Sequence, residues 1–279
     1  MPGRSILRWT VFAVATYLLF FYGMGLRGLV EPDEPRYASI ARHMAESGDW
    51  VTPRLAGEPW FEKPALLYWL GAAGMLAGFP EDQATRFASA FAAVAFLLYF
   101  HRRMRGAFGE SAADAGTAIL ATAGGWAAFA QTGVFDALLT ATLGAALLAL
   151  LDWVRDPERR EGLPLFGALL GLSVLAKGLV GPALAALAML GVCRERGLGA
   201  TAKALFHPRA TGPFLAVAGP WYLLCYLQNG SQFFNEFLWR HHVLRLVSPE
   251  LQHVQPIWFY LPVLVVAILP WTPLVVTLR

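Results

Sequence analysis

Charged residues are scarce in this sequence, and their scarcity excludes an ordinary soluble protein. Asp, Glu, Lys and Arg together make up only 15% of the 279 residues, whereas soluble domains usually contain about a quarter. Hydrophobic residues make up 57%, and the mean hydropathy is +0.49. The sequence therefore predicts an integral membrane protein with no room for a large soluble domain.

Cysteine is almost absent as well. The two cysteines, Cys193 and Cys225, fall in apolar runs whose order places them toward opposite faces of the membrane. The sequence therefore does not predict a disulfide framework.

Motifs for soluble nucleotide-dependent chemistry are missing. The sequence has no Walker loop, no G-x-G-x-x-G opening a helix, no G-x-S-x-G and no Cys-rich metal motif. No nucleotide cofactor is therefore expected. The net charge of +3 does not indicate nucleic-acid binding either, because the basic residues are scattered between apolar runs without an aromatic stacking platform.

What the sequence does have is a series of about eight apolar runs that can cross or nearly cross a bilayer. We read them as helices, because lipid leaves a single open chain no other way to satisfy its backbone. The first run resembles a signal peptide, but further spans follow it, so we interpret it as a retained span. The predicted fold is an all-α membrane protein, a multi-span helical bundle over residues 1–279, with spans at 9–27, 84–101, 112–131, 134–154, 163–176, 179–193, 211–228 and 257–277.

The distribution of charge orients this bundle. If the first span runs from the cytoplasm outward, most Lys and Arg residues lie in inner loops and most acidic residues lie on the outer side. This is the orientation that the positive-inside rule favours. The sequence thus predicts a multi-pass membrane protein whose longer loops lie on the outer side of the membrane.

Two longer segments lie on the outer side, the first extracytoplasmic loop at 28–83 and the second at 229–256. Within the first, apolar residues of 35–48 recur at i, i+3, i+4 and i+7, which predicts an amphipathic helix along the interface. Residues 64–79 are apolar but short for a crossing, and proline stands at or next to both ends. They predict a re-entrant or interfacial helix.

Several ionisable residues lie within or at the ends of apolar runs, although a membrane span can be built without them. Asp136 begins the fourth span, Lys177 interrupts an apolar stretch, and 62-EK-63 lies among aromatic residues. The predicted topology brings them to the outer side, together with 31-EPDE-34 and 241-HH-242. Ionisable residues near spans are functional candidates by default.

Each of these residues also has a structural interpretation. The acids of 31-EPDE-34 can be solvated or capping groups, Asp136 can cap a helix, and Lys177 can extend to the interface. The histidines can be interfacial polar residues. These alternatives explain each position singly, but they do not explain why all of them lie on one side.

Such a set of side chains can carry out only a limited range of reactions. Cations near an interface bind phosphate head groups, and a carboxylate beside them can orient or deprotonate a nucleophile. Together they fit the transfer of a group from a lipid-linked phosphate to an acceptor, with positive charge stabilising the departing phosphate.

At these residues the sequence resembles a known family. The string 32-PDEPRYASIARHMAESGDWVTPRLAGEPWFEKPALLYWL-70 is similar to the first outer loop of polyprenyl-phosphate-dependent glycosyltransferases of the GT-C type, the lipid A aminoarabinose transferases and protein mannosyltransferases. Asp136 at the start of a span, the pair 177-KG-178 and 239-WRHHVLRL-246 are also similar. The resemblance extends over the whole chain, which we expect to be either a short relative or the N-terminal part of a longer family member.

The resemblance implies roles for two acidic residues. Asp33 is expected to be the catalytic base or the group that orients the acceptor, and Asp136 is expected to assist it. We include Glu34, from the same acidic cluster, among the candidate catalytic residues.

The resemblance also implies a set of substrate-binding residues and a metal pair. Lys63 and Arg245 are placed to hold the donor phosphate, and Glu62 with His242 resembles a divalent-metal pair, for zinc or a similar ion, that water or substrate would complete. This chain has His241 where the lipid A enzymes usually have an acidic residue, a difference that bears on the metal and on the acceptor. The full substrate-binding set consists of Lys63, Lys177, Arg245, Arg36 and Tyr37.

The expected function is therefore a glycosyltransferase that moves a sugar from a polyprenyl-phosphate donor to a lipid A-like or other envelope acceptor. The resemblance implies a multi-pass protein of the bacterial inner membrane, with its active site facing the periplasm. Its expected partners are this donor, a lipid or glycolipid acceptor and membrane lipids. Two alternatives stay open, a transporter or flippase of lipid-linked sugars and a catalytically inactive fragment that only binds lipid. A transporter would place its charges near the bilayer midplane.

Overall fold

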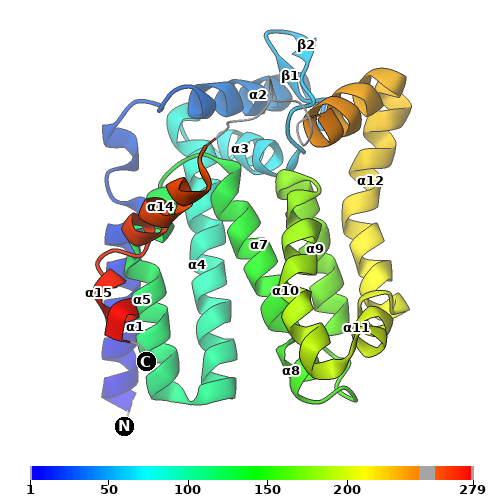
Figure 1. Ribbon diagram of the computed structural model, residues 1–279. Coiled ribbons are helices and arrows are strands. Elements are labelled where there is room, and N and C mark those ends of the chain that lie inside the picture. Colours follow the sequence, from blue (N-terminus) through cyan, green and yellow to red (C-terminus); the bar gives the residue numbers. More distant parts are fainter. Residues whose placement is uncertain (1, 245–254, 278–279) are drawn as a thin grey trace.

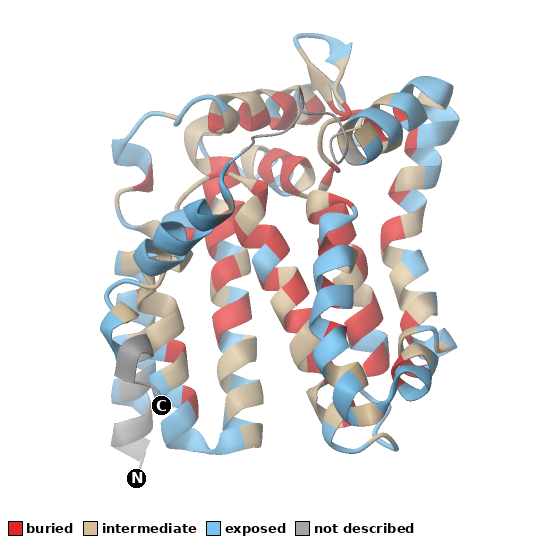
Figure 2. Cartoon of the chain, viewed as in Figure 1, coloured by how far each residue is buried: buried red, intermediate tan, exposed pale blue. Residues whose placement is uncertain are grey.

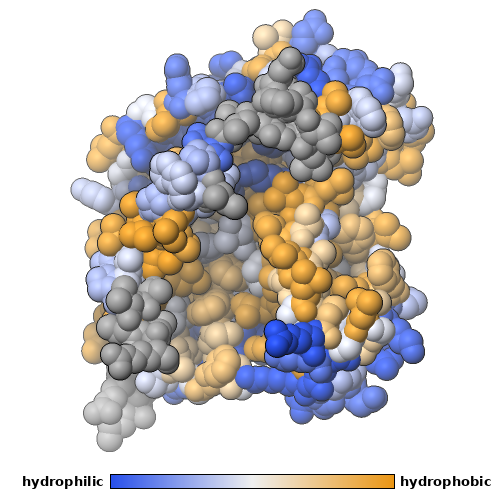
Figure 3. Space-filling model, in the orientation of Figure 1, coloured by the Kyte–Doolittle hydropathy of each residue, from blue (hydrophilic) through white to orange (hydrophobic). Residues whose placement is uncertain are grey.

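The computed structural model describes residues 2–244 and 255–277. Long helices lie side by side, and shorter helices lie across one end of the bundle (Figure 1). We call this end, which carries residues 33–76, the outer end. The opposite end, which carries the turn at 108–110, is the inner end. Polar side chains gather at both ends, and apolar side chains cover much of the flank between them (Figure 3).

The chain passes repeatedly between the two ends. From the N-terminus it forms α1 (Pro2–Thr16), η1 (Tyr17–Phe21), η2 (Met24–Leu26), α2 (Asp33–Ser47), the hairpin β1 (Arg54–Leu55) and β2 (Glu58–Pro59), α3 (Leu66–Leu76), α4 (Glu81–Phe108), α5 (Glu110–Thr122) and α6 (Gly124–Ala130). It continues through α7 (Phe135–Ala149), α8 (Leu151–Arg155), α9 (Leu163–Lys177), α10 (Val180–Arg196), α11 (Leu198–Leu205), α12 (Pro208–Phe233), η3 (Phe234–Leu244), η5 (Ile257–Phe259), α14 (Tyr260–Ala267) and α15 (Thr272–Thr277).

Four helices of the described residues are long and apolar enough to cross a membrane, namely Trp9–Leu26, Glu81–Phe108, Phe135–Arg155 and Pro208–His241. They match four of the predicted spans. Two further predicted spans correspond to α9 and α10, which have only 15 and 17 residues. The predicted number of about eight crossings stays a prediction.

Two predicted spans are broken in the structure. The expected span 112–131 is divided at Ala123, whose extended backbone (φ −64°, ψ 127°) ends α5 and begins α6. The expected span 257–277 is divided into η5, α14 and α15. Apolar composition indicates these stretches correctly as membrane-compatible, but it carries no signal for the break between their helices.

Helix α2 shows how the sequence builds the outer end. Its first turn holds two acidic residues, whose negative charge interacts favourably with the positive end of the helix dipole. It ends at Gly48, whose left-handed conformation (φ 72°) suits glycine. The residues recurring at helical spacing, Tyr37, Ile40, Ala41 and Met44, are buried. The helix predicted from this spacing is confirmed.

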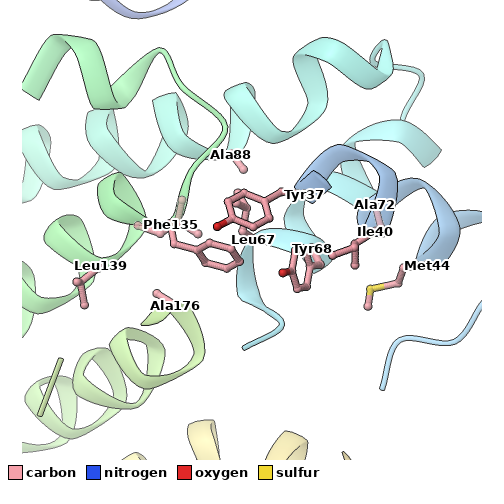
Figure 4. Packing of buried hydrophobic residues seen from close by; sticks show 11 residues of the cluster. Tyr37, Ile40, Met44, Leu67, Tyr68, Ala72, Ala88, Phe135, Leu139 and Ala176 are labelled. Carbon is pink, nitrogen blue, oxygen red and sulfur yellow. The ribbon is translucent and has the colours of Figure 1, made fainter. Parts of the chain in front are cut away.

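A cluster of buried residues fixes the outer helices onto the bundle. The Tyr37 ring of α2 lies edge-on to Phe135 of α7, with 4.9 Å between ring centroids, and 6.0 Å from Tyr68 of α3. Figure 4 shows these rings packed together with Leu67 and Ala176. The buried positions of α2 and α3 are continuous with those of α7 and α9 (Figure 2). The first outer loop is therefore part of the core.

Helix α12 changes direction near the outer end. Gly230 has a non-helical backbone (φ 57°, ψ −139°), and the chain then continues as the π-helix η3. Two hydrogen bonds fasten this region to the first loop: Trp221 Nε1 donates to the Val51 carbonyl at 3.0 Å, and Asn229 Nδ2 donates to Thr52 Oγ1 at 2.8 Å. The turn brings η3 across the outer end.

Candidate active site

A buried ion pair anchors the start of the first outer loop. Arg86, which lies in α4 and is completely buried, donates through Nε to Glu34 Oε1 at 2.8 Å and through Nη2 to Oε2 at 2.5 Å. The backbone amides of Gly133 and Val30 donate to the same carboxylate at 2.6 and 2.8 Å. The Glu34 side chain therefore joins the outer loop, α4 and the segment before α7.

Arg86 uses its remaining donors on the loop itself. Its Nη1 donates to the carbonyls of Met24 and Arg27 at 2.6 and 2.9 Å, and its Nη2 donates to the carbonyl of Gly28 at 2.8 Å. All three guanidinium nitrogens therefore donate, in the fork-like geometry that pairs with a carboxylate. These bonds fix the path of the chain where it leaves the first span and enters the first outer loop.

These contacts give Glu34 a structural position and not the catalytic one that we expected. Burial by itself raises the pKa of Glu34, but the hydrogen bonds from Arg86, Gly133 and Val30 outweigh it and hold the pKa below its ordinary value. The carboxylate is ionised, almost inaccessible and fully bonded, so it has no capacity to accept a proton from a substrate. Its role is to hold the loop.

Asp33, one residue earlier, faces a different environment. About half of its side chain, 47%, is exposed, and Arg36 Nη1 lies 3.4 Å from its Oδ1. The same Nη1 lies 3.5 Å from Glu62 Oε2, and the guanidinium sits over the Trp60 ring at 5.4 Å. Arg36 therefore stands between two carboxylates on the outer surface.

The row of alternating charges continues to Lys63. Lys63 Nζ donates to Glu62 Oε1 at 2.8 Å. Burial by itself raises the pKa of Glu62, but Lys63, His241 and Arg36 together hold it below its ordinary value. Asp33, Arg36, Glu62 and Lys63, which we call the charged row, are thus brought together as the sequence predicts.

Tyr37 is the neutral partner of the charged row. Its hydroxyl lies close to Asp33, and burial, followed by the charges of Asp33 and Glu62, raises the pKa of Tyr37 far above its ordinary value. The phenol therefore stays protonated and is a hydrogen-bond donor beside the carboxylate. In this position it can orient Asp33.

A second pair stands on the neighbouring helices. Lys177, the last residue of α9, donates through Nζ to Asp136 Oδ1 at 2.7 Å, and Asp136 lies in the first turn of α7. Their chain neighbours Ala176 and Phe135 belong to the same buried cluster as Tyr37. The pair is therefore held at the same end of the bundle as the charged row.

The described donors do not fit a closed divalent-metal site. Glu62 faces two cations, Lys63 and Arg36, and the described residues contain no group of three or more His, Cys, Asp or Glu that could hold a metal. His241 lies close enough to lower the pKa of Glu62. The side chain of His242 and all of Arg245 lie outside the described residues. The metal pair stays a prediction.

Sequence reasoning missed Arg86. The signal was present, because an arginine two residues into a predicted span must have a partner. The partner, Glu34, lies 52 residues earlier, and no local pattern connects the two.

Much of the sequence that forms this site matches a known protein family. Residues 62–222 match the model of the dolichyl-phosphate-mannose-protein mannosyltransferase family, and this range is more than half of the chain. The chain belongs to that family.

Bacterial proteins are among the curated relatives of this member of the mannosyltransferase family. Two are the undecaprenyl phosphate-alpha-4-amino-4-deoxy-L-arabinose arabinosyl transferases of Pseudomonas aeruginosa, 34% identical over 95% of this chain, and of Edwardsiella ictaluri, 30% identical over 96% of it. Each match covers 49% of the relative. The chain therefore spans about half the length of the curated relatives it matches.

Solved structures show the same architecture. The crystal structure of ArnT from Cupriavidus metallidurans bound to undecaprenyl phosphate superimposes with a TM-score of 0.84 at 29% identity, over 99% of this chain and 50% of that one. The apo structure of the same protein gives a TM-score of 0.80. The prediction of a helical, multi-pass bacterial membrane protein with a GT-C fold is confirmed, with the short hairpin β1–β2 as an addition to the expected helices.

Proposed function

We propose that this family member takes part in a glycosyl transfer from a polyprenyl-phosphate sugar to a lipid A-like or other envelope acceptor. The reaction would take place at the outer end of the bundle, facing the periplasm, in the bacterial inner membrane. The observation that carries this proposal is the charged row, in which two carboxylates alternate with two cations at the end of the bundle that also holds the pair Asp136 and Lys177.

The donor phosphate would meet the cations of this surface. The guanidinium of Arg36 can bind two phosphate oxygens at once, and the ammonium groups of Lys63 and Lys177 each supply a point charge. Arg245 is expected to add a further cation from the second loop. A phosphate that enters between these cations competes with the carboxylates of Glu62 and Asp136 for the hydrogen bonds that the cations donate. The relative in the crystal structure named above is bound to undecaprenyl phosphate, which supports this class of donor.

Asp33 would act on the acceptor. It is the half-exposed carboxylate of the row, and the Tyr37 hydroxyl beside it can orient it. The acceptor oxygen attacks the anomeric carbon in line, its proton passes to Asp33, and the bond from the anomeric carbon to the phosphate oxygen breaks. The phosphate keeps the electron pair and leaves as polyprenyl phosphate, stabilised by the neighbouring cations.

The position of the charges supports an enzyme over a transporter. Asp33 begins α2, Asp136 lies in the first turn of α7, and Lys177 ends α9. All three therefore stand at helix ends on one side of the bundle, whereas a transporter would have them near the midplane on interrupted helices.

The test is transfer of radiolabelled sugar from its polyprenyl phosphate to a lipid acceptor by the purified protein in detergent. Asp33→Asn should lower kcat by about 10²- to 10⁴-fold, because the amide cannot take the proton. Glu46→Gln, a change of equal charge at an exposed position of the same helix, should leave kcat unchanged. Full activity of correctly inserted Asp33→Asn protein would remove the proposed base.

A further inference from the structure

A groove far from the candidate active site runs between α1, α4 and α5 at the inner end, on helices that stand side by side in Figure 1. It has a volume of about 480 Å³ and is lined mainly by apolar residues, among them Phe12, Leu98 and Ala118. Such a groove has the apolar lining that a hydrocarbon chain requires.

The groove continues into a polar cavity. A second cavity, of about 750 Å³, shares Trp9, Leu98 and His101 with the groove and is also lined by Arg102, Arg103 and Arg105. His101 lies 20 residues after the outer end of α4 at Glu81, which at 1.5 Å per residue is about 30 Å, the thickness of the hydrocarbon. The passage from groove to cavity therefore falls at the inner membrane surface.

The cavity has an excess of positive charge. Asp152 pairs with Arg103 at 3.0 Å, and Glu110 lies 3.8 Å from Arg105, but within the described ranges Arg102 is exposed and has no acidic partner. Asp114, in the groove wall, is paired with His101 at 2.9 Å. Anionic groups at the inner surface are therefore attracted to this cavity.

Two unpartnered polar atoms point to a ligand. The Nη2 atom of Arg103 is buried and has no hydrogen-bond partner among the described residues. The hydroxyl of Thr117, a residue only 5% exposed that lines the groove, has none there either. An unbonded buried donor is costly, and a lipid phosphate and an ester carbonyl would satisfy the two.

We propose that this site binds one anionic, ester-linked phospholipid of the inner leaflet. One acyl chain lies in the groove, the Thr117 hydroxyl donates to its ester carbonyl, and the phosphate lies beside Arg102 and Arg103. A polyprenyl phosphate has no ester carbonyl for Thr117, so the hydroxyl favours a diacyl lipid over the proposed donor.

The test is native mass spectrometry of the purified protein with dioleoyl phosphatidylglycerol and with dioleoyl phosphatidylcholine. The anionic lipid should be retained about tenfold better, and Arg102→Gln should reduce its retention about fivefold, the effect of one interfacial charge. Arg194→Gln, an exposed inner-end arginine of α10 outside the groove, should have no effect. Equal retention of both lipids, or equal effects of the two variants, would overturn the head-group assignment.

Two further variants test the groove itself. Ala118→Trp fills it and should abolish retention, whereas Ala186→Trp on the exposed face of α10 should not. Thr117→Val should weaken retention of phosphatidylglycerol without lowering the thermal stability of lipid-free protein, because it removes a donor that has no partner. If Ala118→Trp retains the lipid, if inorganic phosphate alone displaces it, or if undecaprenyl phosphate is retained better than phosphatidylglycerol, the proposal is wrong. Transfer activity measured in parallel checks that each variant is folded.

Discussion

Lys177 donates a hydrogen bond of 2.7 Å to Asp136, which lies 41 residues earlier in the chain. The bond joins the end of α9 to the beginning of α7, at the end of the bundle that carries the charged row. Both side chains are partly exposed, 27% and 43%, so the ammonium group is accessible to a third, anionic group. A positioned but accessible lysine is what a site for a lipid-linked phosphate requires.

Removing this lysine should weaken donor binding. Lys177→Met is expected to raise the KM for the polyprenyl-phosphate sugar about tenfold to a hundredfold, the effect of one charge-assisted hydrogen bond, with a smaller change in kcat. Steady-state transfer kinetics at varied donor concentration measure it. Lys203→Met, at an exposed inner-end position, is the matched control, and an unchanged KM in folded Lys177→Met protein would exclude Lys177 from the donor site.

The buried pair Glu34 and Arg86 should contribute strongly to stability. Arg86→Met leaves a buried carboxylate without its partner, so we expect a loss of about 3 to 5 kcal/mol in the free energy of unfolding. Arg42→Met breaks an exposed pair with Glu81 of 3.3 Å and should cost less than about 1 kcal/mol. Thermal unfolding in detergent compares the two. Similar losses for both variants would show that Arg86 is not an anchor.

The same pair should make stability depend on pH. Because the pKa of Glu34 is lowered in the folded protein from 4.5, its contribution is present above pH 4.5 and is lost as the pH falls through the folded pKa. The Tm of the wild type should therefore drop more steeply below pH 4.5 than that of Glu34→Gln. Parallel curves for the two proteins from pH 7 to pH 3 would contradict this linkage.

Tyr37 should act through its hydrogen bond and not through its charge. Tyr37→Phe removes the donor that orients Asp33 and should reduce kcat about tenfold, the value of a hydrogen bond to a charged group. Because burial raises the pKa of Tyr37, the alkaline limb of the pH-rate profile should be the same in the wild type and the variant. A limb that disappears in Tyr37→Phe would assign the titration to this phenol.

Local patterns in the sequence predict the helices and the location of the charges well. The spacing of Tyr37, Ile40 and Met44 predicts α2, and the ionisable residues at the helix ends predict the outer surface on which they lie. The sequence analysis did not predict the break at Ala123, although the pair Gly124 and Gly125 follows it directly and adjacent glycines favour turns. At the break, the Gly124 amide donates to the carbonyl of Leu269, in the turn after α14, at 2.7 Å, and no local pattern predicts so distant a partner.

Roles within the candidate site were harder to predict than its position. Glu34 and Asp33 are adjacent acids in one motif, yet one is buried against Arg86 and the other is half exposed. The difference comes from which side of the first turn of α2 faces α4, and the helix phase alone does not reveal a partner 52 residues away. The family resemblance placed the metal pair on Glu62 and His242; the charge of His241 also lowers the pKa of Glu62, and the side chain of His242 lies outside the described residues.

The anchoring of Glu34 has a consequence for protein engineering. A graft that exchanges residues 28–83 between relatives would transplant only one partner, because the arginine and the Gly133 amide belong to the recipient. Chimeras that alter acceptor preference should therefore carry the loop, the beginning of α4 and the segment before α7 as one unit.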